Sequence, residues 1–440
     1  SPGDDKWSTD GNWGGLKPVA NDDLAFNTSS IVSHNNDLGA DININGIVFN
    51  NSAGSFTFAG NRITLNGNIT VGTSLTNETI NLAMILSNNR DVTVNSGVLA
   101  LGGALTSSGG FYLRKYGTGT LVFNSASGAN TYSGGTYLNN GIIRLSANDQ
   151  LPDTGIFYMQ NGGTLSELDL NGYSDTIPAL TFQGGGAQHI TTGAGTLTVT
   201  GDINANNVGG YKLIEGNLSL GGASRNFYGG SAGAPLYISA VITNGTMVHI
   251  GGPRLCLSGP NVFAGGITAQ AGGNTWVEMG CNPVGAVGAV TNGPLGTGTF
   301  TFSNGGLSSD GLTARNIINP VTINSDAYIG SASRTGYLTF KAPIGFSGAD
   351  RQLFVLSDAR FEGQLTNGGL YKRTAGTVLT LANSSTNNAV TTRVNDGTIR
   401  LGANDQLSDT VWHYLGNNGT LSTLDLNGYN ETIGYLQFEG

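Results

Sequence analysis

Charged residues are scarce in this sequence, and those present are mostly acidic. Only 11% of its 440 residues are charged, whereas soluble domains average about 25%. There are 19 Lys and Arg against 28 Asp and Glu, which gives a net charge of −9. Basic residues this few and this scattered form no stripe for holding phosphates, so we expect no nucleic-acid partner.

Long apolar segments are missing as well. No run reaches the roughly 18 residues that a membrane-spanning helix requires. The first residues, 1–5 (SPGDD), have neither the basic nor the apolar segment of a secretory signal. We therefore expect no membrane-spanning segment and, for a secreted protein, a signal that has already been removed.

Histidine and cysteine are too sparse to suggest a metal or cofactor site. The 4 His lie far apart and outside any metal-binding motif, so we expect neither a metal nor a cofactor. The 2 cysteines, Cys256 and Cys281, are separated by about one coil of a coiled parallel fold. Neighbouring parallel strands lie about 4.8 Å apart, within the reach of a disulfide. A Cys256–Cys281 disulfide and two unrelated thiols fit the sequence equally well.

Helical patterns are almost absent, whereas short strand patterns are frequent. Examples are 120–123 (TLVF), 196–200 (TLTVT) and 321–323 (VTI), each bounded by Gly, Asn, Asp or Ser. The chain has 71 Gly, but its 38% hydrophobic content is spread over such runs, which argues against disorder. Strands at this spacing fit a sandwich, a barrel or a solenoid.

An internal repeat favours the solenoid. Residues 141–184 return as residues 397–440 without insertion or deletion, and 28 of the 44 positions are identical. A shorter motif begins at Asn130, at Asn261 and, in degenerate form, at Asn388, so the longer period contains two units. Closed sandwiches do not reproduce sequence in this way, whereas a stack of coils does. We predict an all-β chain folded as a parallel β-helix of about 20 coils, at about 22 residues per coil.

Repeated positions indicate turns rather than chemistry. Asn171-Gly172 returns as Asn427-Gly428, and both pairs are typical of turns between coils. Three aspartates of the first copy, Asp149, Asp153 and Asp169, also return in the second copy. Because a catalytic site normally occurs once in a chain, we interpret the duplicated aspartates as structural. We expect no enzyme activity.

The aromatic residues allow two interpretations. Tryptophans can provide platforms for sugar rings or fill a core, and this choice is open for Trp276 and Trp412. For Trp7 and Trp13 we favour a cap over the first coil, because an uncapped end would expose unpaired strand edges. The predicted organisation is therefore a cap with the first coils in residues 1–40 and a continuous β-helix in residues 41–440.

A family resemblance follows from the motifs. The pattern at 117–145, with GTGTLVF, NTYSGGT and NGIIRL, resembles the autotransporter-associated β-strand repeat, of the PATR type, of bacterial surface proteins. The resemblance is strongest at 112–184, 251–306 and 370–440, and the WSTDGNW segment at 7–13 is similar to the start of such passengers. It implies a right-handed parallel β-helix that is exported to the bacterial cell surface or the medium.

Two functions follow as hypotheses. The first is a structural or adhesive β-helix that forms a rigid stalk or an extracellular fibre. Its partners would be cell-surface glycans or further copies joined end to end, since the sequence stops within a repeated unit at Gly440. The alternative is a β-helix that binds or cleaves polysaccharide, because many such folds carry paired carboxylates on a sheet face.

Overall fold

The chain folds into stacked β-coils, as the sequence predicts. The computed structural model describes residues 4–73, 76–160, 163–205, 209–270, 272–384, 390–417 and 419–439. Parallel strands form a β-solenoid of about 18 turns, which confirms the predicted fold class with slightly fewer coils than the expected 20. The degenerate motif start at Asn388 and the final Gly440 lie outside the described residues.

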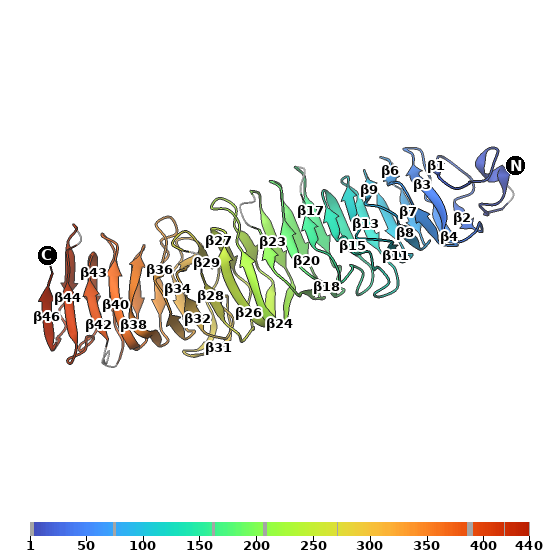
Figure 1. The fold of residues 1–440 in the computed structure, drawn as a ribbon. Helices are drawn as coiled ribbons and strands as arrows, with labels where there is room; N and C mark the ends of the chain where they lie inside the picture. The colour runs from blue at the N-terminus through green and yellow to red at the C-terminus, as the bar shows by residue number, and fades with distance from the viewer. Residues whose placement is uncertain are drawn as a thin grey trace. The chain divides into compact units, whose positions relative to one another are not determined.

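The structure consists of two compact units. The first comprises the described residues of 1–204 and 208–219, and the second those of 205–207 and 220–440. The bounds of a continuous helix over 41–440, and of a cap over 1–40, stay predictions. Figure 1 shows the strands of each unit following one another as rungs.

The described residues of the first unit form one short 3₁₀ helix and 23 complete strands. Its elements are η1 (Asp10–Trp13), β1 (Asp22–Phe26), β2 (Ser33–Asn36), β3 (Ile42–Phe49), β4 (Thr57–Gly60), β5 (Ile63–Leu65), β6 (Ile69–Val71), β7 (Asn77–Ile80), β8 (Met84–Leu86), β9 (Arg90–Val94), β10 (Val98–Leu101), β11 (Leu105–Ser107), β12 (Leu113–Tyr116), β13 (Thr120–Phe123), β14 (Thr136–Leu138), β15 (Gly141–Leu145), β16 (Phe157–Met159), β17 (Ser166–Asp169), β18 (Asp175–Ile177), β19 (Leu180–Phe182), β20 (Gln188–Thr191), β21 (Leu197–Val199), β22 (Ile203–Asn204) and β23 (Lys212–Glu215).

The strands of the second unit follow β24 (Asn217–Tyr228), whose residues divide between the two units. They are β25 (Leu236–Ile238), β26 (Val241–Gly251), β27 (Arg254–Leu257), β28 (Ile267–Ala269), β29 (Trp276–Met279), β30 (Val284–Ala286), β31 (Ala289–Asn292), β32 (Phe300–Phe302), β33 (Gly306–Ser309), β34 (Arg315–Ile317), β35 (Val321–Ile323), β36 (Ala327–Ile329), β37 (Leu338–Phe340), β38 (Ile344–Val355), β39 (Ala359–Phe361), β40 (Leu365–Arg373), β41 (Val378–Leu381), β42 (Thr391–Val394), β43 (Gly397–Leu401), β44 (Trp412–Leu415), β45 (Ser422–Asp425) and β46 (Tyr435–Phe438).

Parallel ladders build each unit, because every coil places its strands on those of the next. In the first unit one ladder runs β1-β3-β6-β9-β12-β14-β16-β19-β22 and a second runs β2-β4-β7-β10-β13-β15-β17-β20-β23. In the second unit the longest ladder runs β25-β27-β29-β33-β36-β38-β40-β42-β44-β46. A separate parallel sheet there contains β34, β37, β39, β41, β43 and β45.

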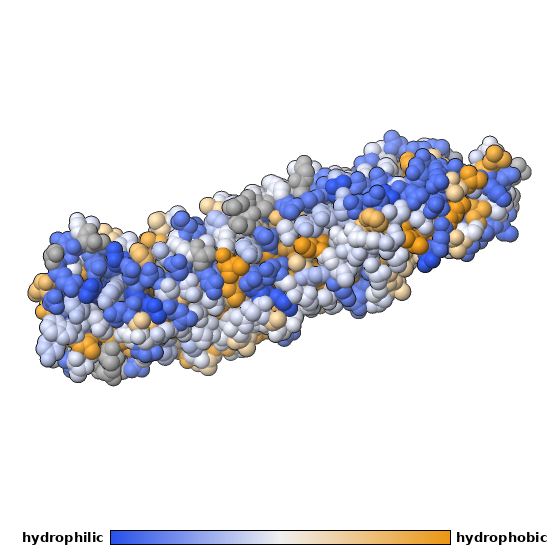
Figure 2. All heavy atoms as spheres, viewed as in Figure 1, coloured by the Kyte–Doolittle hydropathy of each residue, from blue (hydrophilic) through white to orange (hydrophobic). Residues whose placement is uncertain are grey.

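The core is made of inward side chains that stack in register. Leu24 faces Ile47 on the next coil, Ile47 faces Ile69, and all three are buried. Alternate positions, such as Thr64 between Ile63 and Leu65, point outward and are partly exposed. On the face shown in Figure 2, hydrophilic residues predominate and hydrophobic ones form small patches. The apolar/Thr alternation in the sequence therefore corresponds to inside and outside.

Insertions in individual coils account for the lower number of turns. Most register partners lie about 22 residues apart, but Trp276 on β29 faces Gly306 on β33. The intervening segment carries the antiparallel hairpin β30–β31, which projects exposed residues from the second unit. Residues spent on such excursions do not add coils.

Among the described residues, Lys115, Lys212 and Lys372 are buried at inward positions in the ladders. The Nζ of Lys115, on β12, donates to the carbonyl oxygen of Gly117 (2.7 Å), and the Nζ of Lys372, on β40, donates to that of Thr374 (2.6 Å). Burial lowers the pKa of Lys115 to about 7 and that of Lys372 to about 8. Each ammonium satisfies carbonyls at a corner where the chain leaves a strand and its backbone lacks ladder partners.

The segment before β1 covers an aromatic cluster. Lys6 forms a parallel bridge with Asn35 of β2, and η1 then places the Trp13 ring 5.8 Å from the fully buried Trp7 ring. Trp7 packs edge-on against Phe58, with ring centroids 6.0 Å apart. The Nε1 of Trp13 donates to the carbonyl oxygen of Trp7 (3.0 Å), which fixes the two rings together.

We expect the Trp7→Ala variant to loosen the first coils. Removing a fully buried tryptophan costs about 3–5 kcal/mol, and in a stacked fold this loss stays local. Hydrogen exchange followed by mass spectrometry should show faster exchange in β1 to β4 and unchanged exchange beyond β12. Trp412→Ala, at a half-exposed tryptophan of β44, is the matched control. Unchanged protection of β1 to β4 in Trp7→Ala would contradict a capping role.

Candidate functional site

A groove of about 610 Å³ opens on the surface of the second unit. We call it the Trp276 groove and define it by Arg254, Trp276, Tyr328, Ser331, Ser333 and Arg334. Its volume lies within the range of about 300–1,000 Å³ that small-molecule sites occupy. The defining side chains combine two aromatic rings, two guanidinium groups and three hydroxyls, one of them the phenol of Tyr328.

Strand register positions the aromatic wall. Arg254, Trp276, Gly306, Tyr328 and Phe354 face one another in turn along β27, β29, β33, β36 and β38. Tyr328 stacks on Phe354 with centroids 4.7 Å apart, so one face of its ring is covered. Gly306 contributes no side chain on the other side of Tyr328, and a gap in the outward ladder results.

The Trp276 ring lies across this gap. A Cβ at Gly306 would come within 2.9 Å of the Cδ1 and Nε1 atoms of Trp276, so a glycine is required beneath the ring. The Nε1 of Trp276 donates to the carbonyl oxygen of Gly330 (2.9 Å), beyond the end of β36. The indole is thereby held along the stack of coils instead of standing out from it.

A buried carboxylate fixes both arginines of the groove. Glu278 is fully buried and accepts two bonds from Arg254, Nε to Oε1 (2.6 Å) and Nη2 to Oε2 (2.8 Å). The Nε of Arg334 lies 2.8 Å from Oε1 of the same carboxylate. Hydrogen bonding to Glu278 raises the pKa of Arg254, whereas burial lowers that of Arg334. Two guanidinium groups share one carboxylate, which leaves one net positive charge in an otherwise acidic chain.

Other outward aromatic residues form closed stacks. Tyr137 and Tyr158, on β14 and β16, are stacked with centroids 4.3 Å apart and planes 11° apart. Arg393 is sandwiched between Tyr371 and Tyr414, with its Cζ 4.6 and 4.4 Å from the ring centroids. Rings stacked in this way cover each other's faces and stabilise neighbouring coils.

The two cysteines do not face each other, because only Cys256 lies on a strand of the ladder. Cys256, on β27, faces Glu278 on β29, while Cys281 follows the end of β29. Both thiols are free in the structure. Burial raises the pKa of Cys256 to about 12, so its thiolate form is suppressed at neutral pH. The register places Glu278 opposite Cys256, and the choice between a Cys256–Cys281 disulfide and two unrelated thiols stays a prediction.

The repeated Asn-Gly pairs occupy equivalent turns in the two units. Asn171 and Asn427 have φ angles of 51° and 52°, and the following Gly172 and Gly428 have φ angles of 85° and 82°. Left-handed backbone of this kind is tolerated by Asn and preferred by Gly. The Nδ2 of each asparagine donates to a backbone carbonyl of the preceding coil, at 3.2 and 3.1 Å.

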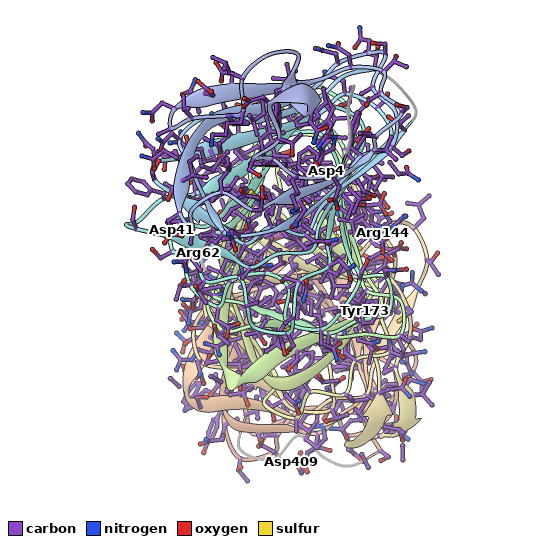
Figure 3. The ribbon with its side chains drawn as sticks, turned by 90° about the vertical axis from the view of Figure 1, so that its right-hand side faces the viewer. Asp4, Asp41, Arg62, Arg144, Tyr173 and Asp409 are labelled. Carbon is purple, nitrogen blue, oxygen red and sulfur yellow. The ribbon has the colours of Figure 1, made fainter. Side chains whose placement is uncertain are left out.

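Ion pairs link neighbouring coils on the outer surface of the first unit. The Nη2 of Arg62 donates to Oδ2 of Asp41 (2.9 Å), and Figure 3 shows the two side by side. Arg144, also labelled there, donates from Nε to Oδ2 of Asp169 (2.7 Å). Asp169 is one of the duplicated aspartates, and its contacts are those of a residue that holds coils together.

A carboxylate recurs at the same corner of each copy of the repeat, buried in the first copy and partly buried in the second. The Oδ2 of Asp175 accepts bonds from the backbone amides of Gln150 (2.7 Å) and Leu151 (3.0 Å). In the second copy Glu431 stands in place of Asp175 and accepts from the backbone amide of Gln406 (2.7 Å). Burial raises the pKa of Asp175 to about 7 and also raises that of Glu431.

Sequence reasoning identified only Trp276 among the residues of the groove. Arg254, Glu278, Tyr328 and Arg334 are scattered over 81 sequence positions (254 to 334) without a shared motif. They meet because coil register and the corner after β36 bring them together. Within the described ranges, no group of three or more His, Cys, Asp or Glu side chains is placed to hold a metal ion.

Comparison with known proteins supports the family resemblance. Residues 113–145 match the profile of the passenger-associated-transport-repeat. This segment is similar to that repeat. It includes Lys115 and the corner that this lysine stabilises. The predicted resemblance to PATR-type autotransporter passengers is thereby confirmed.

The chain is also similar to the adhesin BmaC autotransporter of Brucella suis biovar 1 (strain 1330). The two are 27% identical over 436 residues, which is 88% of this chain. The chain spans 12% of the length of that protein. No solved structure matches the chain. Among the described residues, no helix has the length and apolar character needed to cross a membrane.

We expect Asp175 to make stability depend on pH. Its folded pKa of about 7 exceeds the unfolded value of about 3.9, so the folded chain retains a proton that the unfolded chain has released. Stability should therefore fall as pH rises from about 4 to 7, by up to about 4 kcal/mol from this group. Denaturant unfolding at pH 5 and pH 8 measures the difference, and Asp175→Asn should reduce it. The control is Asp153→Asn, at an exposed aspartate before the same corner. Equal pH dependence in wild type and Asp175→Asn would contradict this assignment.

Proposed function

We propose that this chain acts as a secreted, surface-displayed adhesive passenger of a bacterium. The observation that carries the proposal is the match to the passenger-associated transport repeat at 113–145, together with similarity to an autotransporter adhesin across 88% of the chain. The solenoid supports it physically, because stacked coils extend by repetition and present a long regular surface. In this proposal the β-solenoid is a rigid stalk on the cell surface, exported after removal of a signal.

A binding role fits the Trp276 groove better than a cleaving role. Polysaccharide hydrolysis generally requires two carboxyl groups at the bond that is broken. The residues that line the groove include no Asp or Glu. Glu278, which lies beneath it, is fully buried and is engaged by both arginines. We therefore propose a non-enzymatic function, with polysaccharide binding as the second candidate.

Surface display tests the adhesive function. Escherichia coli cells that display this chain on an autotransporter barrel should adhere to epithelial cells or extracellular matrix several-fold more than cells displaying the barrel alone. Purified chain added in solution should reduce adhesion, because it competes for the same receptors. Equal adhesion of the two strains, at equal display measured by surface labelling, would overturn the proposal.

The proposal includes end-to-end assembly, in which a second copy continues the parallel ladders. Within the chain each coil pairs in parallel with the next, as β44 does with β42 and with β46, the strand that contains Tyr435 and Phe438. A stack of coils can be extended by a further strand in the same way. A second copy whose first coil docks on β46 would extend this ladder.

Sedimentation velocity tests this assembly. The wild-type chain should form larger species as its concentration rises, and Phe438→Asp should sediment as a monomer at every concentration because a buried charge opposes docking. Leu312→Asp, at a leucine of the same unit that is 79% exposed, is the matched control and should behave like wild type. A monomeric wild-type chain at high concentration would contradict end-to-end assembly.

A further inference from the structure

We propose that the Trp276 groove binds an acidic saccharide, with a sugar ring against Trp276 and its carboxylate at Arg334. This inference deepens the proposed adhesive function by naming the chemical class of ligand, and it rests on that function only for its biological role. The site itself is argued from the groove.

Trp276 differs from the other outward aromatic residues in how its ring is held. Tyr137 and Tyr158 stack face to face, so their faces are covered by each other. Trp276 has Gly306 as its ladder neighbour on one side and Arg254 on the other, and its ring lines the groove. The Cζ of Arg334 lies over this ring, 5.8 Å from its centroid, so a sugar ring on Trp276 would lie beside the Arg334 guanidinium. A tryptophan ring fixed by a hydrogen bond is a rigid apolar surface that costs little entropy when it receives a sugar ring.

The charge of the groove selects an acidic ligand. Arg254 forms a bidentate pair with Glu278, which satisfies that carboxylate. Arg334 contacts the same carboxylate through Nε and the hydroxyl of Ser333 through Nη1 (3.1 Å). Within the described residues its Nη2 forms no hydrogen bond. The Arg334 guanidinium is therefore the group that a ligand carboxylate would neutralise.

The remaining groups of the groove suit a polyhydroxylated ligand. The hydroxyls of Ser331 and Ser333 lie 3.4 Å apart at its edge, and each can donate and accept hydrogen bonds. Backbone around Gly273 approaches the Tyr328 ring so closely that a Cβ there would lie 2.4 Å from it, which keeps this wall narrow. Apolar faces with a few convergent polar groups are typical of ligand sites.

Binding of a defined saccharide tests the inference. Trigalacturonic acid and 3′-sialyllactose are titrated into the full chain by calorimetry. Their neutral counterparts, the methyl-esterified trigalacturonate and lactose, serve as matched probes. We expect at least one acid to bind at least tenfold more tightly than its neutral counterpart. Because a charge-assisted contact is involved, this preference should weaken at high salt.

Variants connect the binding to the groove. Arg334→Gln leaves Glu278 paired with Arg254 and removes the excess charge, so the acid should lose at least tenfold in affinity and its advantage over the neutral probe. Trp276→Ala should weaken both probes. Gly306→Ala should weaken both without removing any binding side chain, because its Cβ displaces the indole. Arg400→Gln and Trp412→Ala, outside the groove, should match wild type, and circular dichroism verifies that every variant is folded.

The outcomes separate this inference from the adhesive function. Equal affinity for acidic and neutral probes, no binding of either acid, or unchanged binding by folded Arg334→Gln and Trp276→Ala overturns the acidic-saccharide site. Displayed variants are then compared for adhesion. Loss of acid binding with unchanged adhesion confirms the groove as a saccharide site but assigns adhesion to another surface. Groove-dependent acid binding by a chain that confers no adhesion leaves the site standing and overturns the proposed function.

Discussion

The parallel register between coils is the constraint on which the rest of this structure depends. Each strand bonds to the strand one coil away, so residues about 22 positions apart become neighbours. Inward positions then place apolar side chains on apolar side chains of the next coil, as with Leu24, Ile47 and Ile69. The low charge of the chain is a consequence, because each inward stack has to be apolar or internally satisfied and the corners need Gly and Asn more than charge.

Four ionisable side chains bond to the backbone at the corners of the coils. Lys115 and Lys372 donate to carbonyls at corners, whereas Asp175 and Glu431 accept from amides at corners. Burial depresses the pKa of the lysines and elevates that of the acids, because both charged forms lose hydration. All four side chains lose hydration and bond to the backbone where a strand ends. We therefore assign them a structural role, in which they replace the ladder bonds that the backbone lacks there.

The groove lies where one outward position of the ladder carries no side chain. Some outward ladder positions hold stacked rings, such as Tyr137 on Tyr158, but Gly306 leaves one position empty and Trp276 lies across it. Glu278 then holds Arg254 and Arg334 at the edge, although these arginines are far apart in sequence. A regular scaffold thus gains a distinct site through one small residue and one buried carboxylate, without any change in the fold around it.

The sequence by itself determined the architecture and the family resemblance. Strand alternation, Gly and Asn punctuation and the copy of 141–184 at 397–440 are local or periodic signals, and the same contacts recur around Asn171 and Asn427. Only the tertiary structure decided the division into two units, the facing of Cys256 with Glu278, and the assembly of the Trp276 groove. These depend on how many residues each coil contains, and a single hairpin such as β30–β31 shifts which side chains meet. Spacing along the chain cannot specify that shift, because it is set by three-dimensional pairing.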